Sequence, residues 1–195
     1  MSEHLVVLPE GGTRHRQLEA DGWAVIARSW AAELDLRHTD RRLLRDYVGR
    51  VGPEAVVREL GCGDVDMVLQ LDAATAGDYP GGVATRHGLL TRERATPSAR
   101  RRGFGAFTSP GDLAAMTFVD VHGNRAEIDF TVVATDRRGR GLGTAVKAAA
   151  VLALIDTRVR LVRTGGSAEN AAIRSINDAL GFVVDEHWVT LAPPA

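Results

Sequence analysis

Residues 133–144 read VATDRRGRGLGT, and this stretch is the most informative part of the chain. It contains three glycines, Gly139, Gly141 and Gly143, which can adopt positive φ values and let the backbone approach a ligand closely. The residues that follow, 141–155, read GLGTAVKAAAVLALI and are rich in the strong helix formers Ala and Leu. The N–H groups in the first turn of a helix have no partner within the helix and lie at the positive end of its dipole. The stretch therefore predicts a site for a phosphate or pyrophosphate group.

Two common nucleotide-binding motifs do not fit this stretch. A P-loop needs Gly, four residues and then Gly-Lys-Ser/Thr, but Lys147 comes four residues after Gly143. A Rossmann fingerprint needs a third glycine at position 146, where the chain has Val146, and no acidic residue ends the next predicted strand. A dinucleotide-binding module is therefore a disfavoured alternative.

The surrounding segments alternate between strand-like and helix-like patterns, which predicts an α/β (or α+β) fold. Gly123-Asn124 is expected to be a hairpin turn, Asp64 the N-cap of a helix and Gly181 the C-cap of another. The strands are expected over 23–33, 112–121, 125–135, 158–163 and 182–191, the helices over 40–60 (one or two), 64–74, 83–94, 141–155 and 169–180, and a loop over 96–105.

The pattern Arg138-x-x-Gly141-x-Gly143 resembles the motif that GNAT acetyltransferases carry between a strand and a helix. The strand before it (126–130), Asn170 and Leu180-Gly181-Phe182 resemble other parts of that superfamily in the same order. The resemblance covers about residues 112–184. It implies a GNAT fold, in which a mixed central sheet has splayed parallel strands and is flanked by helices.

The resemblance further implies that acetyl-CoA is the acyl donor. The pantetheine would run along the first splayed strand, and the pyrophosphate would be held by backbone N–H groups at the start of the helix. Asn170 would contact the far end of the donor, although it also suits a helix cap, and Asn177 would face the sulfur. The residues expected to bind acetyl-CoA are Val133, Ala134, Thr135, Arg138, Gly139, Arg140, Gly141, Leu142, Gly143, Thr144, Asn170 and Asn177.

Two carboxylates on the preceding strand are the candidates for catalysis. An alkyl ammonium, with a pKa of about 10, must lose a proton before it attacks a thioester. Glu127 occupies a position that resembles that of the catalytic glutamate in histone acetyltransferases of the superfamily, and Asp129 follows two residues later. One would act as the base and the other would bind the amine. The alternative is that both lie on a solvated strand face.

The chain departs from the family at the leaving group. Many members have a tyrosine that protonates the departing thiolate at the position of Asn177. An amide donates a hydrogen bond but does not deliver a proton at neutral pH. We therefore assign no general acid. Lys147 is expected to be an exposed helix residue, with a phosphate contact as the alternative.

The first 60 residues differ from the rest. We expect residues 1–60 to form an N-terminal extension and residues 61–192 the acetyltransferase domain. A helix end, a glycine, an aromatic residue and a strand occur in that order around Gly22-Trp23 and again around Gly181-Phe182. The extension is thus either the remnant of a second repeat or similar by chance.

Composition narrows the class of protein. The chain has 195 residues, a net charge of −1 and one cysteine, Cys62. These values argue against nucleic-acid or membrane partners, an intrachain disulfide and a zinc cluster, and no metal site is expected. No signal peptide is recognisable, so a cytoplasmic enzyme is expected, and the Arg-, Ala- and Gly-rich composition suggests a bacterial source.

Three functions remain open at this point. The first is acetylation of a small-molecule amine, the second is acetylation of a protein amine, and the third is acyl-CoA binding without catalysis. A homodimer is also possible. The sequence identifies neither the amine nor the length of the acyl group.

Overall fold

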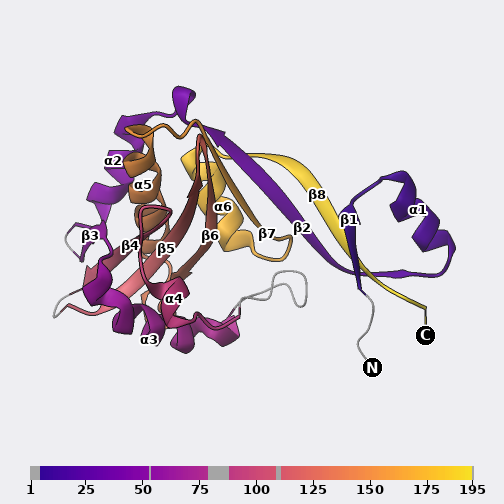
Figure 1. Ribbon diagram of the computed structural model, residues 1–195, viewed down its shortest axis with the longest axis horizontal. Helices are drawn as coiled ribbons and strands as arrows, with labels where there is room; N and C mark the ends of the chain where they lie inside the picture. Colours follow the sequence, from indigo (N-terminus) through magenta and orange to yellow (C-terminus); the bar gives the residue numbers. More distant parts are fainter. Residues whose placement is uncertain (1–4, 53, 79–87, 109–110, 195) are drawn as a thin grey trace.

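The computed structural model describes residues 5–52, 54–78, 88–108 and 111–194, which form one mixed sheet with helices on both faces (Figure 1). The strand order is β1-β8-β2-β7-β6-β5-β4-β3. The strands are β1 (Val6–Pro9), β2 (Ala24–Asp35), β3 (Ala55–Glu59), β4 (Arg101–Thr108), β5 (Leu113–His122), β6 (Arg125–Val133), β7 (Leu161–Ser167) and β8 (Val183–Ala192). The helices are α1 (Thr13–Ala20), α2 (Arg41–Arg50), α3 (Val65–Thr75), α4 (Arg92–Ala95), α5 (Leu142–Ile155) and α6 (Ala171–Leu180).

Strands β6 and β7 pair in parallel over a short distance and then separate. Their registered pairs are Arg125↔Leu161, Ala126↔Val162 and Glu127↔Arg163. Beyond these pairs, β6 remains bonded to β5 as far as Val133, and β7 remains bonded to β2 as far as Ser167. The expected mixed sheet with splayed parallel strands is therefore confirmed.

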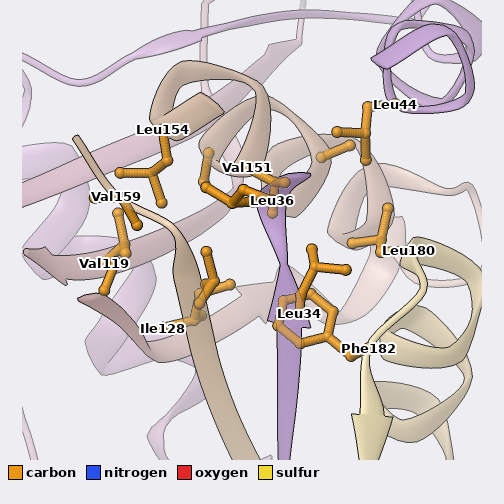
Figure 2. Packing of buried hydrophobic residues seen from close by; sticks show 14 of the residues in the cluster. Leu34, Leu36, Leu44, Val119, Ile128, Val151, Leu154, Val159, Leu180 and Phe182 are labelled. Carbon is orange, nitrogen blue, oxygen red and sulfur yellow. The ribbon is translucent and has the colours of Figure 1, made fainter. Parts of the chain in front are cut away.

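The two faces of the sheet carry different helices. Phe118 and Val119 are consecutive on β5, so their side chains point to opposite faces. Phe118 packs with Val68 and Leu71 of α3, whereas Val119 belongs to the cluster around α5. Figure 2 shows this second cluster, in which Val151 and Leu154 of α5 meet residues of β2, β5, β6, α2 and α6.

The helix expected over 141–155 is found as α5. Its apolar side chains are buried on almost every side of the helix. The expected helices over 64–74 and 169–180 are also found as α3 and α6. Of the expected strands, that over 158–163 begins only at Leu161 as β7. Asp64 is the N-cap residue of α3, as expected, but its side chain makes no capping hydrogen bond to that helix and instead accepts one from the N–H of Gly61, at 2.7 Å.

Two expectations were partly wrong. The second half of the loop expected over 96–105 is strand β4, in which two arginines of the run have carboxylate partners: Arg101 donates to Asp120 and Arg102 donates to Glu59. The second half of the helical segment 40–60 is strand β3, which pairs with β4. Of the helix expected over 83–94, residues 83–87 lie outside the described residues, and the rest is helical only over α4.

The N-terminal segment is interleaved with the rest of the sheet. Strand β2 lies between β7 and β8, and β3 pairs with β4. The outer parts of β2 and β8 extend with β1 and α1 as an arm beyond the other helices (Figure 1). Gly22 (φ +85°) and Gly181 (φ +86°) both follow a helix and precede a strand, as the sequence similarity between them suggested. Strands from both sides of residue 60 share one sheet. The expected division into an extension (1–60) and a domain (61–192) stays a prediction.

Candidate acyl-donor site

A cleft of about 490 Å³ opens where β6 and β7 diverge. Its walls are the end of β6, the turn into α5, the start of α6 and the end of α3 with the residues after it. The lining residues are Thr75, Asp78, Thr131, Val132, Val133, Arg137, Arg138, Gly139, Gly141, Leu142, Gly143, Thr144, Asn170, Ala172, Ile173, Ser175 and Ile176.

The start of α5 has free backbone N–H groups, an arrangement that suits an anion. Gly139 and Gly141 have φ values of +76° and +80°, as the glycine pattern predicted, and Gly141 is an N-cap without a side-chain hydrogen bond. The first intrahelical bond runs from the N–H of Ala145 to the carbonyl of Gly141 at 3.0 Å, so the N–H groups of the residues between them face away from the helix. A Cβ at Gly143 would lie 3.1 Å from Ile176 Cδ1 and 3.2 Å from Val133 Cγ2. This glycine therefore lets α5 pack closely against Ile176 and Val133, two of the residues that line the cleft.

Arg138 crosses the mouth of the cleft. Its Nε donates to the carbonyl of Val133 at 3.2 Å, and its Nη2 donates to Asp78 at 2.5 Å. Thr135 Oγ1 also donates to Asp78, at 2.9 Å. The hydrogen bonds from Thr135 and Arg138 hold the pKa of the Asp78 carboxyl below its usual value. Asp78 is a cleft residue that the sequence reasoning missed, because its place in the site depends on how α3 packs.

Asn170 is a helix cap, and its expected contact with the donor stays a prediction. Its Oδ1 accepts from the N–H of Ile173 at 3.1 Å, so it caps α6, and it also lines the cleft. Four of the other expected residues are not among the lining residues. Ala134 and Thr135 follow the end of β6, Arg140 lies 3.5 Å from Glu54 in an exposed ion pair, and Asn177 is buried.

Lys147 is completely buried, so the expectation of an exposed lysine was wrong. Its Nζ donates to Thr164 Oγ1 at 3.0 Å and, through a shorter hydrogen bond, to Asn177 Oδ1. The Phe182 ring centroid lies 5.2 Å from Nζ. Burial lowers the pKa of the Lys147 ammonium to about 7. The sequence did carry one signal, since Lys147 interrupts a run of Ala, Val and Leu in an otherwise apolar helix.

Asn177 lies beneath the cleft and does not line it. It is 1% exposed, and its Nδ2 has no hydrogen-bond partner among the described residues. Thr164, on the other side of Lys147, follows directly after Arg163, the last β7 residue that pairs with β6. The cluster of Lys147, Thr164 and Asn177 therefore marks the closed end of the splay.

Glu127 lies at the same level of the splay, on the opposite face of the sheet. It is the register partner of Arg163, and its neighbours Ala126 and Ile128 point into the α5 cluster. Alternation along β6 therefore directs Glu127 away from α5. Its side chain is exposed and has no hydrogen-bond or ion-pair partner in the described part of the chain.

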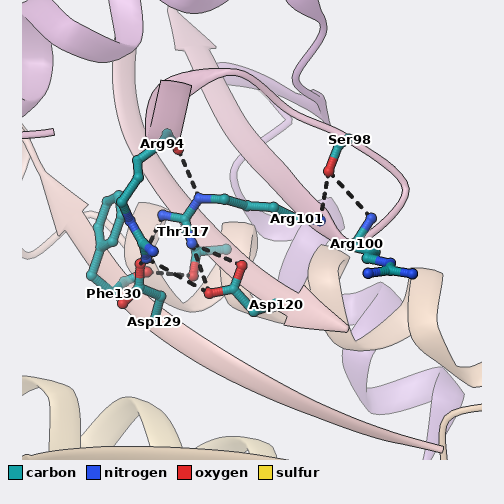
Figure 3. Close-up of polar contacts among 8 residues, drawn as sticks. All are labelled: Arg94, Ser98, Arg100, Arg101, Thr117, Asp120, Asp129 and Phe130. Atoms are coloured by element: carbon teal, nitrogen blue, oxygen red, sulfur yellow. Dashed lines mark hydrogen bonds and ion pairs between the residues drawn. The ribbon is translucent and has the colours of Figure 1, made fainter. Parts of the chain in front are cut away.

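Asp129 is held in an arginine network (Figure 3). It accepts from Arg101 Nη2 and from Arg94 Nη2, both at 2.7 Å, while Arg101 also bonds Asp120. Burial alone would raise the pKa of the Asp129 carboxyl, but the hydrogen bonds and charges of the two arginines outweigh burial and lower it. The register between β5 and β6 shifts at this point, so Asp129 is the extra residue of a bulge. The side chains of Glu127 and Asp129 therefore lie in different environments.

Within the described residues, no group of three or more His, Cys, Asp or Glu side chains is placed to hold a metal ion. No helix in this part of the chain is long and apolar enough to cross a membrane.

The sheet, the splay and the cleft define a GNAT-type acyltransferase fold. A scan against protein-family models and a search of curated proteins give no match. Solved structures do match. A tandem GNAT protein from the clavulanic acid biosynthesis pathway, described without AcCoA, has a TM-score of 0.66 and 26% identity over 96% of this chain. GCN5-related N-acetyltransferases from Sphaerobacter thermophilus (TM-score 0.66, 15% identity) and Kribbella flavida (0.65, 14%) match over 100% and 98% of this chain and over 63% and 68% of their own lengths.

The chain has the fold of the GNAT superfamily of acetyltransferases. It spans 62% of the length of the tandem GNAT protein.

Proposed function

We propose that this protein is an N-acetyltransferase that moves an acetyl group from acetyl-CoA to a primary amine of a small molecule, by direct attack in a ternary complex. The observation that carries this proposal is the uncapped N-terminus of α5 at the open end of the splay, where Gly139 and Gly141 have positive φ. The GNAT fold of the solved relatives supports the same reaction class.

The residues present fit a pyrophosphate-bearing donor. The N–H groups of Leu142, Gly143 and Thr144 would hold the pyrophosphate, and Arg138 would move from Asp78 to a phosphate oxygen. The backbone of Val133, at the end of β6, would hydrogen-bond the pantetheine. Acetyl-CoA supplies an activated acetyl thioester when it is bound.

Glu127 is the proposed base. Its unpaired carboxylate lies at the closed end of the splay, facing away from α5, so an amine approaching from that face would reach the thioester from the side opposite the cleft. Glu127 would take the ammonium proton, directly or through water. Asp129 has a structural role instead, because both of its arginine contacts hold it in the ionised form.

One observation favours a second function, acyl-CoA binding without turnover. Asn177, at the position where many relatives have a tyrosine, donates a hydrogen bond but does not transfer a proton at neutral pH. If departure of the sulfur is not assisted in some other way, the fold would bind the donor but not use it.

Calorimetric titration with acetyl-CoA tests the proposal. We expect the wild-type protein to bind and Gly141→Asp to lose binding, because a carboxylate would lie where the pyrophosphate belongs. Gly123→Asp is the matched control: it also has positive φ (+63°), but it lies in the β5–β6 turn at the other end of β6, and it should bind normally. Circular dichroism would verify that both variants fold.

A thiol-release assay with a panel of small amines then separates the two functions. Turnover with any amine supports the acetyltransferase, and binding without turnover supports the acyl-CoA sensor. Absence of acetyl-CoA binding to the wild-type protein would refute both.

A further inference from the structure

The buried cluster of Lys147, Thr164 and Asn177 contains polar groups that packing alone does not explain. Lys147 has no carboxylate partner among the described residues, and its neighbours are a hydroxyl, an amide and an aromatic ring. A buried ammonium without a counter-ion is costly, and replacing it with an apolar side chain often stabilises a protein. Such a group is typical of a functional site.

The orientation of the Asn177 amide follows from Lys147. An ammonium only donates hydrogen bonds, so the atom of Asn177 that faces Nζ is the oxygen. The amide nitrogen must then point away from Lys147. This Nδ2 is buried and has no partner among the described residues, which costs about 1–3 kcal/mol for a donor left without an acceptor.

The cluster lies beneath the cleft, next to residues that line it. Gly143, which lines the cleft, is one helical turn before Lys147 and on the same face of α5. Ile176, which also lines the cleft, directly precedes Asn177. Thr164 is the first β7 residue beyond the last pair with β6. A linear donor that has its pyrophosphate at the start of α5 and runs into the splay would therefore direct its sulfur toward this cluster.

We propose that the Lys147–Asn177 pair receives the departing sulfur of the acyl donor, with Asn177 Nδ2 donating a hydrogen bond to the sulfur and the Lys147 ammonium stabilising its negative charge. This inference rests on the proposed function. The amine nitrogen, having lost its proton to Glu127, forms a bond to the acetyl carbonyl carbon. The carbon–sulfur bond then breaks and its electron pair stays on sulfur, which leaves as a thiolate and takes a proton from water. Lys147 keeps its own proton, so no general acid is needed.

The titration of bound CoA tests this role without any knowledge of the amine. A free thiol has a pKa of about 8.5. We expect CoA bound to the wild-type protein to ionise with a constant at least about ten-fold larger, followed by the ultraviolet absorbance of the thiolate. Lys147→Met and Asn177→Leu should still bind CoA by calorimetry but lose this ten-fold gain. Thr190→Val is the matched control, since it removes a different buried polar atom, the Thr190 hydroxyl on β8, which also has no partner in the described part of the chain, and it should keep the gain.

The outcomes separate the two proposals. If CoA does not bind to the wild-type protein, the proposed function and this inference fail together. If CoA binds but its thiol ionises as in free solution, or ionises equally in wild type and both variants, only the role of the pair is refuted.

A second measurement covers variants that do not fold. Lys147 is the only lysine in the chain, so carbon-13 labelling gives a single lysine signal. If protonated Lys147 favours ionisation of the bound thiol by a given factor, then the bound thiolate must raise the proton affinity of Lys147 by that factor. A Lys147 titration that does not change with CoA would overturn the proposal.

Discussion

The Nζ of Lys147 lies 3.0 Å from Oγ1 of Thr164, the first residue of β7 beyond its last pair with β6. This contact places the only lysine of the chain inside the core at the point where the sheet begins to open. On the opposite face of the same point lies Glu127. The proposed base and the proposed stabiliser of the leaving group thus flank the reaction centre from two sides of one sheet.

Lys147 should make the stability of the protein depend on pH. The pKa of its ammonium is about 7 in the folded protein and about 10.4 in the unfolded chain. Between these values the unfolded chain binds more protons, so the free energy of unfolding rises with pH by about 1.4 kcal/mol per unit from this group. Below pH 7 the contribution is constant. Lys147→Met should lack this slope, as measured by urea denaturation between pH 6 and pH 9. Equal slopes in both proteins would show that burial does not shift the lysine.

Arg101 should be a major stabilising residue. It is 8% exposed, bonds Asp120, Asp129 and the carbonyl of Arg94, and lies over the Phe118 ring. Arg101→Met leaves two partly buried carboxylates without their main partner, so the free energy of unfolding should fall by about 2–4 kcal/mol. The neighbouring Arg100→Met alters an exposed side chain and should change it by less than about 0.5 kcal/mol. Similar losses in both variants would contradict the assigned role.

Asp78 should weaken acetyl-CoA binding, because it competes with phosphate for Arg138 and adds a negative charge to the cleft. Asp78→Asn should therefore bind acetyl-CoA about three- to ten-fold more tightly by calorimetry, with a smaller difference at high salt. Asp66→Asn is the control. Asp66 lies on α3 and, like Asp78, pairs with an arginine (Arg92), but it does not line the cleft. Weaker binding by Asp78→Asn would mean that Asp78 orients Arg138 productively.

Glu127→Gln should reduce kcat for any amine found in the panel by about 10²- to 10⁴-fold, the usual contribution of a positioned base. The loss should shrink toward pH 10, where the amine deprotonates in solution. Affinity for acetyl-CoA should not change, because Glu127 is outside the cleft. Glu93→Gln, an exposed carboxylate on α4, serves as the control for a general charge effect. Unchanged turnover by Glu127→Gln would exclude it as the base.

The N-terminal segment should be indispensable from β2 onward. Removal of residues 1–12 deletes the edge strand β1, and the protein should still unfold cooperatively. Removal of residues 1–38 deletes β2, the strand that joins β7 to β8, and should abolish cooperative thermal unfolding. A folded product of the longer deletion would show that the segment is a dispensable extension.

Much of the fold was predictable because its signals are local. The Gly123-Asn124 turn, the Ala-rich helix α5 and the glycine C-cap Gly181 depend on the residues themselves. Strand β4 was missed because an arginine run looks solvated until Asp120, Asp129 and Glu59 are placed beside it. Those partners are distant in sequence, so no local pattern could reveal them.

The sequence by itself determined the strand, the turn and the helix that form the anion site, because glycine conformations and unpaired helix N–H groups are properties of a short segment. Only the tertiary structure decided which polar side chains share that site. Asp129 proved to be bound by arginines, Glu127 to have no partner within the described residues, and Lys147 to be buried against Asn177. The reason is physical: charge, burial and hydrogen bonding depend on neighbours that the sheet and helices bring together from distant parts of the chain.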